Sequence, residues 1–127
     1  MMPEISVLIP CYNYGHYLEY ALESVTSQSY QNWEAIVIDD GSTDDTPQVT
    51  TQFDDPRIRY IYQDNRGLSA ARNTGLRSAQ ADLIALLDAD DIWQAEYLAK
   101  MVTKLKMHPD AVAAYCGYQY IDQDGEN

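Results

Sequence analysis

The sequence predicts one α/β domain with a mostly parallel β-sheet that is covered by helices on both faces. Short apolar runs rich in β-branched residues alternate along the chain with stretches whose apolar residues recur at helical spacing. Strands that alternate with helices pair in parallel and need helices on both faces of the sheet. A length of 127 residues suits a single domain with its own core.

The expected strands are short and mostly buried. The run at 57–62 alternates between apolar and polar residues, which is typical of a strand nearer the edge of a sheet. The run at 111–121 is rich in tyrosine and is expected to form the last strand. Uninterrupted apolar runs, expected to be buried strands, lie at residues 5–9, 34–38 and 82–87.

Helices are expected between these strands. Leu18, Ala21, Leu22 and Val25 are spaced i, i+3, i+4 and i+7, which is the spacing of one buried helix face. The other helices are expected at residues 43–53, 67–79 and 98–105.

Acidic residues dominate the charge of the chain. There are 20 acidic and 8 basic residues, which gives a formal net charge of −12. Nucleic acids and anionic membrane surfaces are bound by patches of lysine and arginine, so this composition argues against both. The carboxylates could serve solubility alone or, where they cluster, hold a cation.

Cysteine usage and hydropathy predict the compartment. Cys11 and Cys116 stand apart from any CxxC or Cys/His cluster, which argues against a zinc site or a disulfide framework. No apolar run approaches 18 residues, and the N-terminus lacks the basic start and apolar core of a signal peptide. We therefore expect a cytoplasmic domain at residues 1–121, without a transmembrane segment and followed by a polar tail at 122–127.

Polar clusters follow three of the predicted strands and begin at Pro10, Asp39 and Asp88. Parallel strands place their carboxyl ends at one edge of the sheet, where ligands of such sheets bind. One aspartate after a strand is usually a helix cap, but five carboxylates at two strand ends would repel one another without a cation. Mg²⁺ or Mn²⁺ prefers such oxygen ligands, so Asp88-Ala89-Asp90-Asp91 is the expected cation site.

A second group of residues suits an anion. Residues 65–68 precede the helix that carries Arg72, and a glycine-led helix start offers backbone N–H groups to an anion. Arg72 could reach a diphosphate with its planar guanidinium, or pair with a carboxylate such as Asp39 or Asp88. The motifs GxGxxG and GxxxxGK[ST] do not occur, so dinucleotide-binding and P-loop sites lack their sequence support.

Taken in order, these segments resemble glycosyltransferase family 2, whose members have the Rossmann-like GT-A fold. The resemblance extends from Ile5 to about Tyr120, and Asp88-Ala89-Asp90-Asp91 matches the DxD motif of the family. The other segments that carry it are residues 6–13, 22–30, 37–44 and 65–75. It implies a nucleotide-diphosphate sugar as donor, expected to be a UDP-sugar, and an unknown saccharide, lipid or protein as acceptor.

The resemblance also implies roles in binding the nucleotide. Pro10 and Tyr12 would line the nucleotide pocket, and Asp39 would accept a hydrogen bond from the base. The side chain of Asp40 is expected to cap the next turn instead of touching the donor.

Further roles are implied around the diphosphate. Asp88 would lie near the ribose and the donor sugar, and Asp90 would bind the metal that bridges the diphosphate. Arg72 would lie near the phosphates or support Asp39, and Asp91 would orient the loop.

The resemblance implies sugar transfer with inversion, assisted by a carboxylate base well after the DxD motif. The carboxylates after Tyr120 are Asp122, Asp124 and Glu126, and none of them is expected to be this base. We therefore expect the base downstream of Asn127 and the chain to be a fragment or a truncated homologue. The full-length protein could be peripheral to a membrane, and an exposed sheet edge could favour a homo-oligomer.

Two functions of other classes compete with this one. A module that binds a nucleotide sugar without turnover fits the missing base. A phosphoacceptor receiver domain fits the size and the acidity, but it needs an acidic pair after the first strand and a late lysine. Here Asp39-Asp40 follows the second strand, and no lysine follows Met107.

Overall fold

The computed structural model describes residues 2–126 as four strands and four helices in strict alternation. The strands are β1 (Ile5–Cys11), β2 (Trp33–Asp40), β3 (Ile58–Gln63) and β4 (Leu83–Leu86). The helices are α1 (Gly15–Thr26), α2 (Thr46–Thr51), α3 (Leu68–Ser78) and α4 (Tyr97–Met107). The predicted alternation of strands and helices is therefore confirmed as far as α4.

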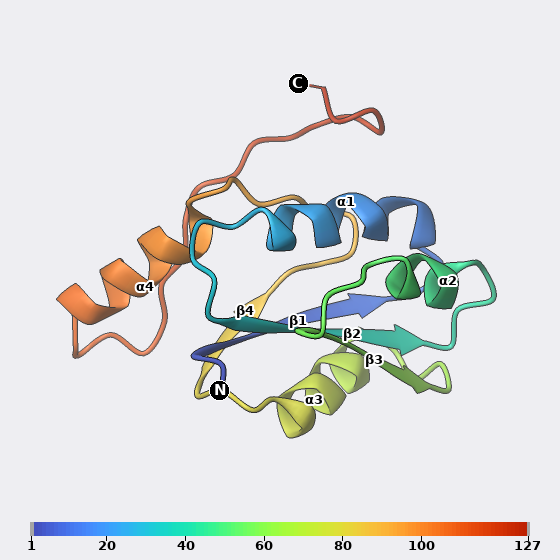
Figure 1. The fold of residues 1–127 in the computed structure, drawn as a ribbon, viewed down its shortest axis with the longest axis horizontal. Helices are drawn as coiled ribbons and strands as arrows, with labels where there is room; N and C mark the ends of the chain where they lie inside the picture. The colour runs from blue at the N-terminus through green and yellow to red at the C-terminus, as the bar shows by residue number, and fades with distance from the viewer. Residues whose placement is uncertain (1, 127) are drawn as a thin grey trace.

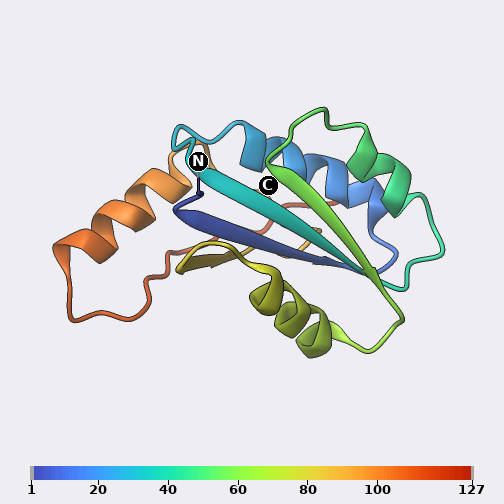
Figure 2. The ribbon, with the colours of Figure 1, turned by 60° about the horizontal axis from the view of Figure 1, so that its bottom comes forward.

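All strand pairs in the sheet are parallel, and the order of the strands is β3-β2-β1-β4 (Figure 2). The chain adds β2 and β3 on one side of β1 and then returns to place β4 on its other side. The direction of winding therefore reverses between β1 and β4, and ligands of parallel sheets bind in the crevice at such a reversal.

Helices cover both faces of the sheet, as the sequence predicts (Figure 1). The larger core joins one face of β1 and β2 to residues of α1, α2 and α4. The residues predicted to form the buried face of α1 are all fully buried in this core: Leu18, Ala21, Leu22 and Val25. The smaller core lies on the opposite face, where Ala71 of α3 packs with Leu8, Ile36 and Ile38.

Helix α3 lies close against the sheet because Gly75 has no side chain. A Cβ atom at Gly75 would lie 3.0 Å from a methyl carbon of Ile38 and 3.1 Å from one of Leu8. A larger residue would push the helix outward, and α3 would then carry its N-terminal end away from the ends of the strands.

Helix α2 is shorter than the predicted helix at 43–53. It begins at Thr46 with Pro47 in its first turn, where the fixed φ of proline suits a helix start. Thr43 and Asp44 lie outside the helix and bind the loop after β1. The carboxylate of Asp44, for example, accepts hydrogen bonds from the backbone N–H groups of Gly15 and Thr46.

The predicted fifth strand at 111–121 is wrong. This segment has no strand hydrogen bonds, and the side chains of Tyr115, Tyr118 and Tyr120 are more than four-fifths exposed. A strand needs a neighbour for its backbone groups, and the segment instead runs from α4 across the molecule toward α1 (Figure 1). High β-propensity alone does not make a strand when the segment pairs with no neighbouring strand.

Strand β4 forms an outer edge of the sheet among the described residues. Burial alternates along this strand, and Ile84 and Leu86 are its exposed residues. They lie on the same face of the sheet as α3, but α3 packs mainly on β1 and β2. Strand β3 forms the opposite edge, as predicted for the run at 57–62, and the tyrosine-rich segment forms no edge. Self-association through an exposed sheet edge stays a prediction.

The helices of the described chain are short. The longest, α1, has 12 residues, and none within residues 2–126 has the length and apolarity that a membrane crossing requires.

Candidate functional site

A cavity of about 400 Å³ opens at the carboxyl ends of β1 and β4, at the point where the winding of the sheet reverses. Its walls come from the loop after β1, the end of β2, the start of α3 and the loop after β4. The lining residues are Pro10, Cys11, Tyr12, Tyr14, Asp40, Asn65, Gly67, Leu68, Ala71, Asp88, Ala89 and Asp90. The predicted site residues Pro10, Tyr12, Asp88 and Asp90 are thus brought together.

The loop after β1 is fixed by a turn at Asn13, whose φ of 55° lies in the left-handed region that asparagine tolerates. Its N–H donates to the Ser42 hydroxyl at 2.9 Å, and its side-chain oxygen accepts from the N–H of Thr43 at 2.8 Å. Tyr12, the residue before the turn, is thereby left half exposed at the cavity.

Asp39 is completely buried at the end of β2 and does not line the cavity. One of its carboxylate oxygens accepts the N–H of Ser42 at 2.8 Å, and the other accepts the hydroxyl of Tyr60 at 2.5 Å. Burial and the hydrogen bond to Asp39 raise the pKa of Tyr60, so its hydroxyl keeps its proton and stays a donor. The sequence predicts that Asp40 caps the turn after β2, but the side chain that caps it is Asp39. The role of Asp39 toward a base stays a prediction.

Asp40 holds the loop before α3 against the end of β2. Its carboxylate accepts the N–H groups of Arg66 and Gly67, each at 2.9 Å, and the side-chain amide of Gln63 at 2.7 Å. Burial alone would raise the pKa of Asp40, but these hydrogen bonds lower it below its ordinary value overall. The backbone N–H groups of Arg66 and Gly67, which the sequence predicts as anion ligands, therefore already donate to Asp40.

The same two loops approach each other at Gly41, which has a φ of +80°. A Cβ atom there would lie 2.7 Å from the backbone nitrogen of Asn65. Only glycine fits this position, because both the backbone conformation and the space exclude a side chain.

Arg72 reaches the site through Asp88. Its guanidinium donates to the Asp88 carboxylate at 3.1 Å, whereas Asp39, the other partner that the sequence allowed, is engaged elsewhere. Arg72 does not line the cavity, but Asp88 does. The Nε atom of Arg72 is buried and has no hydrogen-bond partner among the described residues.

Asp90 is exposed at the rim of the cavity. Burial, followed by the charges of Asp90 and Asp88, raises the pKa of neighbouring Asp91. Negative charge thus accumulates at this loop, where a hard cation would relieve it.

The five carboxylates at the ends of β2 and β4 do not form one cluster, contrary to the prediction from the sequence. Asp39 and Asp40 direct their oxygens to nearby loops, and among residues 2–126 no three His, Cys, Asp or Glu side chains come together as a ready-made metal site. The donor set at Asp90 still fits Mg²⁺ or Mn²⁺, because such an ion commonly takes one or two carboxylates and completes its shell with phosphate oxygens and water.

The loop after Asp90 is fixed by Gln28, which is buried beyond the end of α1. The Gln28 amide nitrogen donates to the carbonyl of Gln94 at 2.7 Å, and its oxygen accepts the N–H of Leu98 at 3.0 Å. These bonds connect α1 to the start of α4 and so limit how far the acidic loop can move.

Sequence reasoning missed Tyr14 and Asp40 as lining residues of the cavity. Tyr14 lies just before α1 and is 43% exposed, whereas Asp40 is buried at the end of β2 and still borders the cavity. The position of Asp40 directly after a buried strand was the available signal.

Comparison with known proteins identifies the family of the chain. Residues 6–127 match the family model described as "Glycosyl transferase family 2". The chain is 36% identical over 124 residues to the glycosyltransferase GlyA of Streptococcus pneumoniae, and 38% identical over 126 residues to the glycosyltransferase TuaG of Bacillus subtilis. The two matches span 96% and 97% of this chain, but only 18% of GlyA and 50% of TuaG.

Solved structures with the same fold contain nucleotide ligands. TarS of S. aureus in complex with UDP superposes with a TM-score of 0.78 at 26% identity, over 84% of this chain and 33% of that one. The mannosyltransferase PcManGT of Pyrobaculum calidifontis, in complex with GDP-Man and Mn²⁺, superposes with a TM-score of 0.76 at 31% identity. This match spans 83% of this chain and 33% of that one. These neighbours are similar to the chain over the domain described above.

Proposed function

This chain belongs to glycosyl transferase family 2, and we propose that it is the donor-binding domain of an inverting glycosyltransferase that uses a nucleotide-diphosphate sugar. The observation that carries the proposal is the cavity at the β1–β4 reversal, which combines Pro10 and Tyr12 with the carboxylates Asp88 and Asp90. The UDP and UDP-GlcNAc complexes of TarS support a UDP-sugar as donor.

Each lining element has a part in this proposal. Pro10 and Tyr12 provide the apolar wall for the nucleoside, and Asp39 supports the base-binding end of the loop. Asp88 lies beside the ribose and donor sugar, held in place by Arg72. The guanidinium also contributes positive charge next to a dianionic diphosphate.

We assign the metal to Asp90. A Mg²⁺ or Mn²⁺ ion bound there would supply Lewis-acid charge to the leaving diphosphate. The Mn²⁺ in the PcManGT complex supports the choice of ion.

The proposed reaction is a direct displacement at the anomeric carbon. The acceptor oxygen bonds to that carbon as the bond to the diphosphate oxygen breaks, and the diphosphate leaves with the electron pair. The acceptor proton passes to a carboxylate base, which we place in the part of the longer relatives that this chain does not cover.

Isothermal titration calorimetry with UDP and with GDP tests the proposal. We expect UDP to bind in the presence of Mn²⁺ and to bind at least tenfold more weakly with excess EDTA. Asp90→Ala should remove most of this Mn²⁺ dependence, whereas Asp110→Ala, an exposed aspartate outside the cavity, should retain it. Absence of binding by both nucleotides in Mn²⁺ would refute the proposal.

A module that binds the donor without turnover is the second candidate. The coverage of half or less of GlyA and TuaG favours it for the isolated chain. Incubation with UDP-GlcNAc and Mn²⁺ separates the two functions, because release of free GlcNAc or transfer to an added saccharide would count against a module without turnover.

A further inference from the structure

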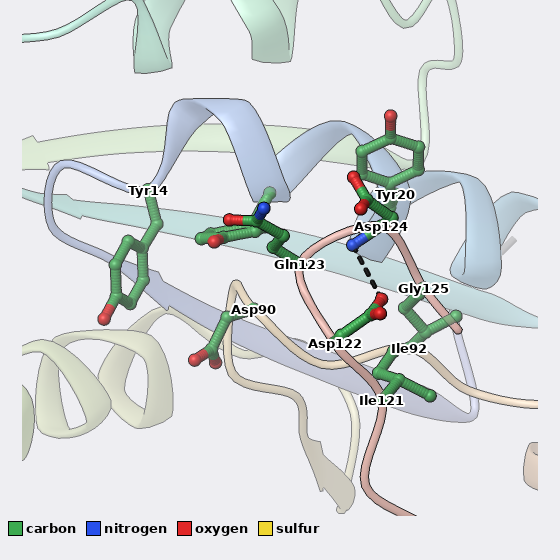
Figure 3. A pocket seen from close by; sticks show the side chains of 10 residues that line it. Tyr14, Tyr20, Asp90, Ile92, Ile121, Asp122, Gln123, Asp124 and Gly125 are labelled. Atoms are coloured by element: carbon green, nitrogen blue, oxygen red, sulfur yellow. Dashed lines mark hydrogen bonds between the residues drawn. The ribbon is translucent and has the colours of Figure 1, made fainter. Parts of the chain in front are cut away.

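A second cavity has a volume of about 280 Å³ (Figure 3). One wall is the start of α1 with Tyr14, Tyr17 and Tyr20, and the opposite wall is the turn at 121–125. Asp90 lies between Tyr14 and this turn (Figure 3). Asp90 and Tyr14 also line the donor cavity, so the two cavities share a rim.

The turn at 121–125 keeps a defined shape because of Asp122. One oxygen of its carboxylate accepts the backbone N–H groups of Asp124 and Glu126, both at 2.9 Å, and the N–H of Gly125 donates to the Asp122 carbonyl at 3.0 Å. The sequence predicts residues 122–127 as a polar tail, and the turn within it lines the cavity opposite α1.

The tyrosines of this cavity suit a sugar ring. Tyr14 and Tyr20 are 43% and 54% exposed, and Tyr14 and Tyr17 pack edge to face with ring centroids 5.6 Å apart. Exposed tyrosines offer an apolar face at low conformational cost and a hydroxyl for hydrogen bonding. A saccharide has the matching pattern, with C–H groups on its ring faces and hydroxyls around its edge.

The charge of the lining selects among saccharides. Asp122 and Asp124 line the cavity beside Asp90, the proposed metal ligand, and the lining residues within the described chain include no lysine, arginine or histidine. Carboxylates accept hydrogen bonds from hydroxyls but repel phosphate and carboxylate groups. This lining therefore favours a neutral ligand over an anionic one.

We propose that the second cavity is an acceptor subsite for a neutral, hydroxyl-rich saccharide, which reaches the donor cavity past Asp90 and Tyr14. The proposal rests on the proposed function, because it places the acceptor beside the donor. Within that function it names the acceptor class and assigns Tyr17, Tyr20 and Asp124 to a site outside the donor cavity.

Titration of ¹⁵N-labelled protein with neutral sugars tests this subsite, with cellobiose, maltose and chitobiose as probes. We expect at least one of them to shift the amide signals of Tyr17, Tyr20 and Asp124, and Tyr20→Ala to weaken its binding by about fivefold. Tyr62→Ala is the matched control, since Tyr62 is 57% exposed on β3 and lines neither cavity. UDP binding with Mn²⁺ should be unchanged in both variants.

A second comparison tests the charge preference. Glucose 6-phosphate should bind at least threefold more weakly than glucose, and Asp124→Lys should reduce or reverse that difference. Failure of all neutral probes to bind, equal loss in Tyr20→Ala and Tyr62→Ala, or stronger binding of glucose 6-phosphate by the unmodified chain would overturn the subsite. Sugar binding without UDP binding would refute the donor proposal instead, so the two failures are distinguishable.

Discussion

The guanidinium of Arg72 donates to the carboxylate of Asp88 at 3.1 Å, and this ion pair joins α3 to the loop that follows β4. The two side chains are 35% and 43% exposed. Exposed ion pairs contribute little to stability, typically below about 1 kcal/mol, because water screens them. The pair therefore has its main effect on where Asp88 stands at the cavity.

Arg72→Ala should weaken UDP binding with Mn²⁺ by roughly tenfold while changing the free energy of unfolding by less than about 1 kcal/mol. The loss arises because the variant removes positive charge beside the diphosphate and frees Asp88 to move. Calorimetry and urea denaturation measure the two quantities. Arg77→Ala, at the exposed end of the same helix, is the control and should leave both unchanged. A large loss of stability with intact UDP binding would show that Arg72 is structural only.

The hydrogen bonds to Asp40 predict an acid-sensitive fold. The pKa of Asp40 is lower in the folded chain than its ordinary value of 3.8, so the ionised carboxylate stabilises the fold at neutral pH. This stabilisation is lost as the pH falls below about 4 and the folded-state carboxylate takes up a proton. The pKa values of Glu34, Asp44 and Asp55 are lowered as well, so their contributions change in the same direction.

Asp40→Asn should therefore destabilise the chain by roughly 2 kcal/mol at pH 7, and by clearly less near pH 3. The amide loses the charged acceptor of the Arg66 and Gly67 N–H groups, but the unmodified chain loses it too once it is protonated. Urea denaturation at several pH values measures the difference. A difference that stays constant from pH 7 to pH 3 would contradict this account, and Asp110→Asn should keep the unfolding midpoint at pH 7.

Local patterns in the sequence were sufficient for the order of elements up to α4. The apolar spacing of α1 and the apolar runs of β1 and β2 each encode burial within a few residues, so they can be recognised one at a time. The segment at 111–121 failed because its β-propensity says nothing about whether a sheet edge is available to it.

The site was predictable in its parts but not in its connections. Strand ends in a parallel sheet had to meet, so Pro10, Asp88 and Asp90 could be placed at one edge. Which carboxylates turn toward the cavity depends on hydrogen bonds between distant loops, such as Asp40 with Gly67, and on partners such as Tyr60 for Asp39. No local spacing encodes those pairs.

Gln28→Ala should destabilise the chain by roughly 2–3 kcal/mol, because it leaves the Gln94 carbonyl and the Leu98 N–H without their partner. It should also loosen the loop after Asp90, and so raise the Mn²⁺ concentration needed for UDP binding by a fewfold. Chemical denaturation and calorimetry at varied Mn²⁺ measure these effects. Gln80→Ala removes an exposed glutamine side chain and should change neither. Unchanged Mn²⁺ dependence in a destabilised Gln28→Ala would limit Gln28 to a role in folding.

Tyr60→Phe tests the part that Asp39 plays at the base. The variant removes a partly buried hydroxyl whose hydrogen bond to Asp39 measures 2.5 Å, and it should cost about 1–3 kcal/mol of stability by leaving one carboxylate oxygen short of a donor. If Asp39 orients the base-binding loop, binding of UDP should weaken in this variant, whereas binding of pyrophosphate with Mn²⁺ should not, because pyrophosphate carries no base. Tyr62→Phe, two residues along β3 and half exposed, provides the matched control. Equal weakening of UDP and pyrophosphate would instead assign the effect to the diphosphate end of the cavity and remove Asp39 from base recognition.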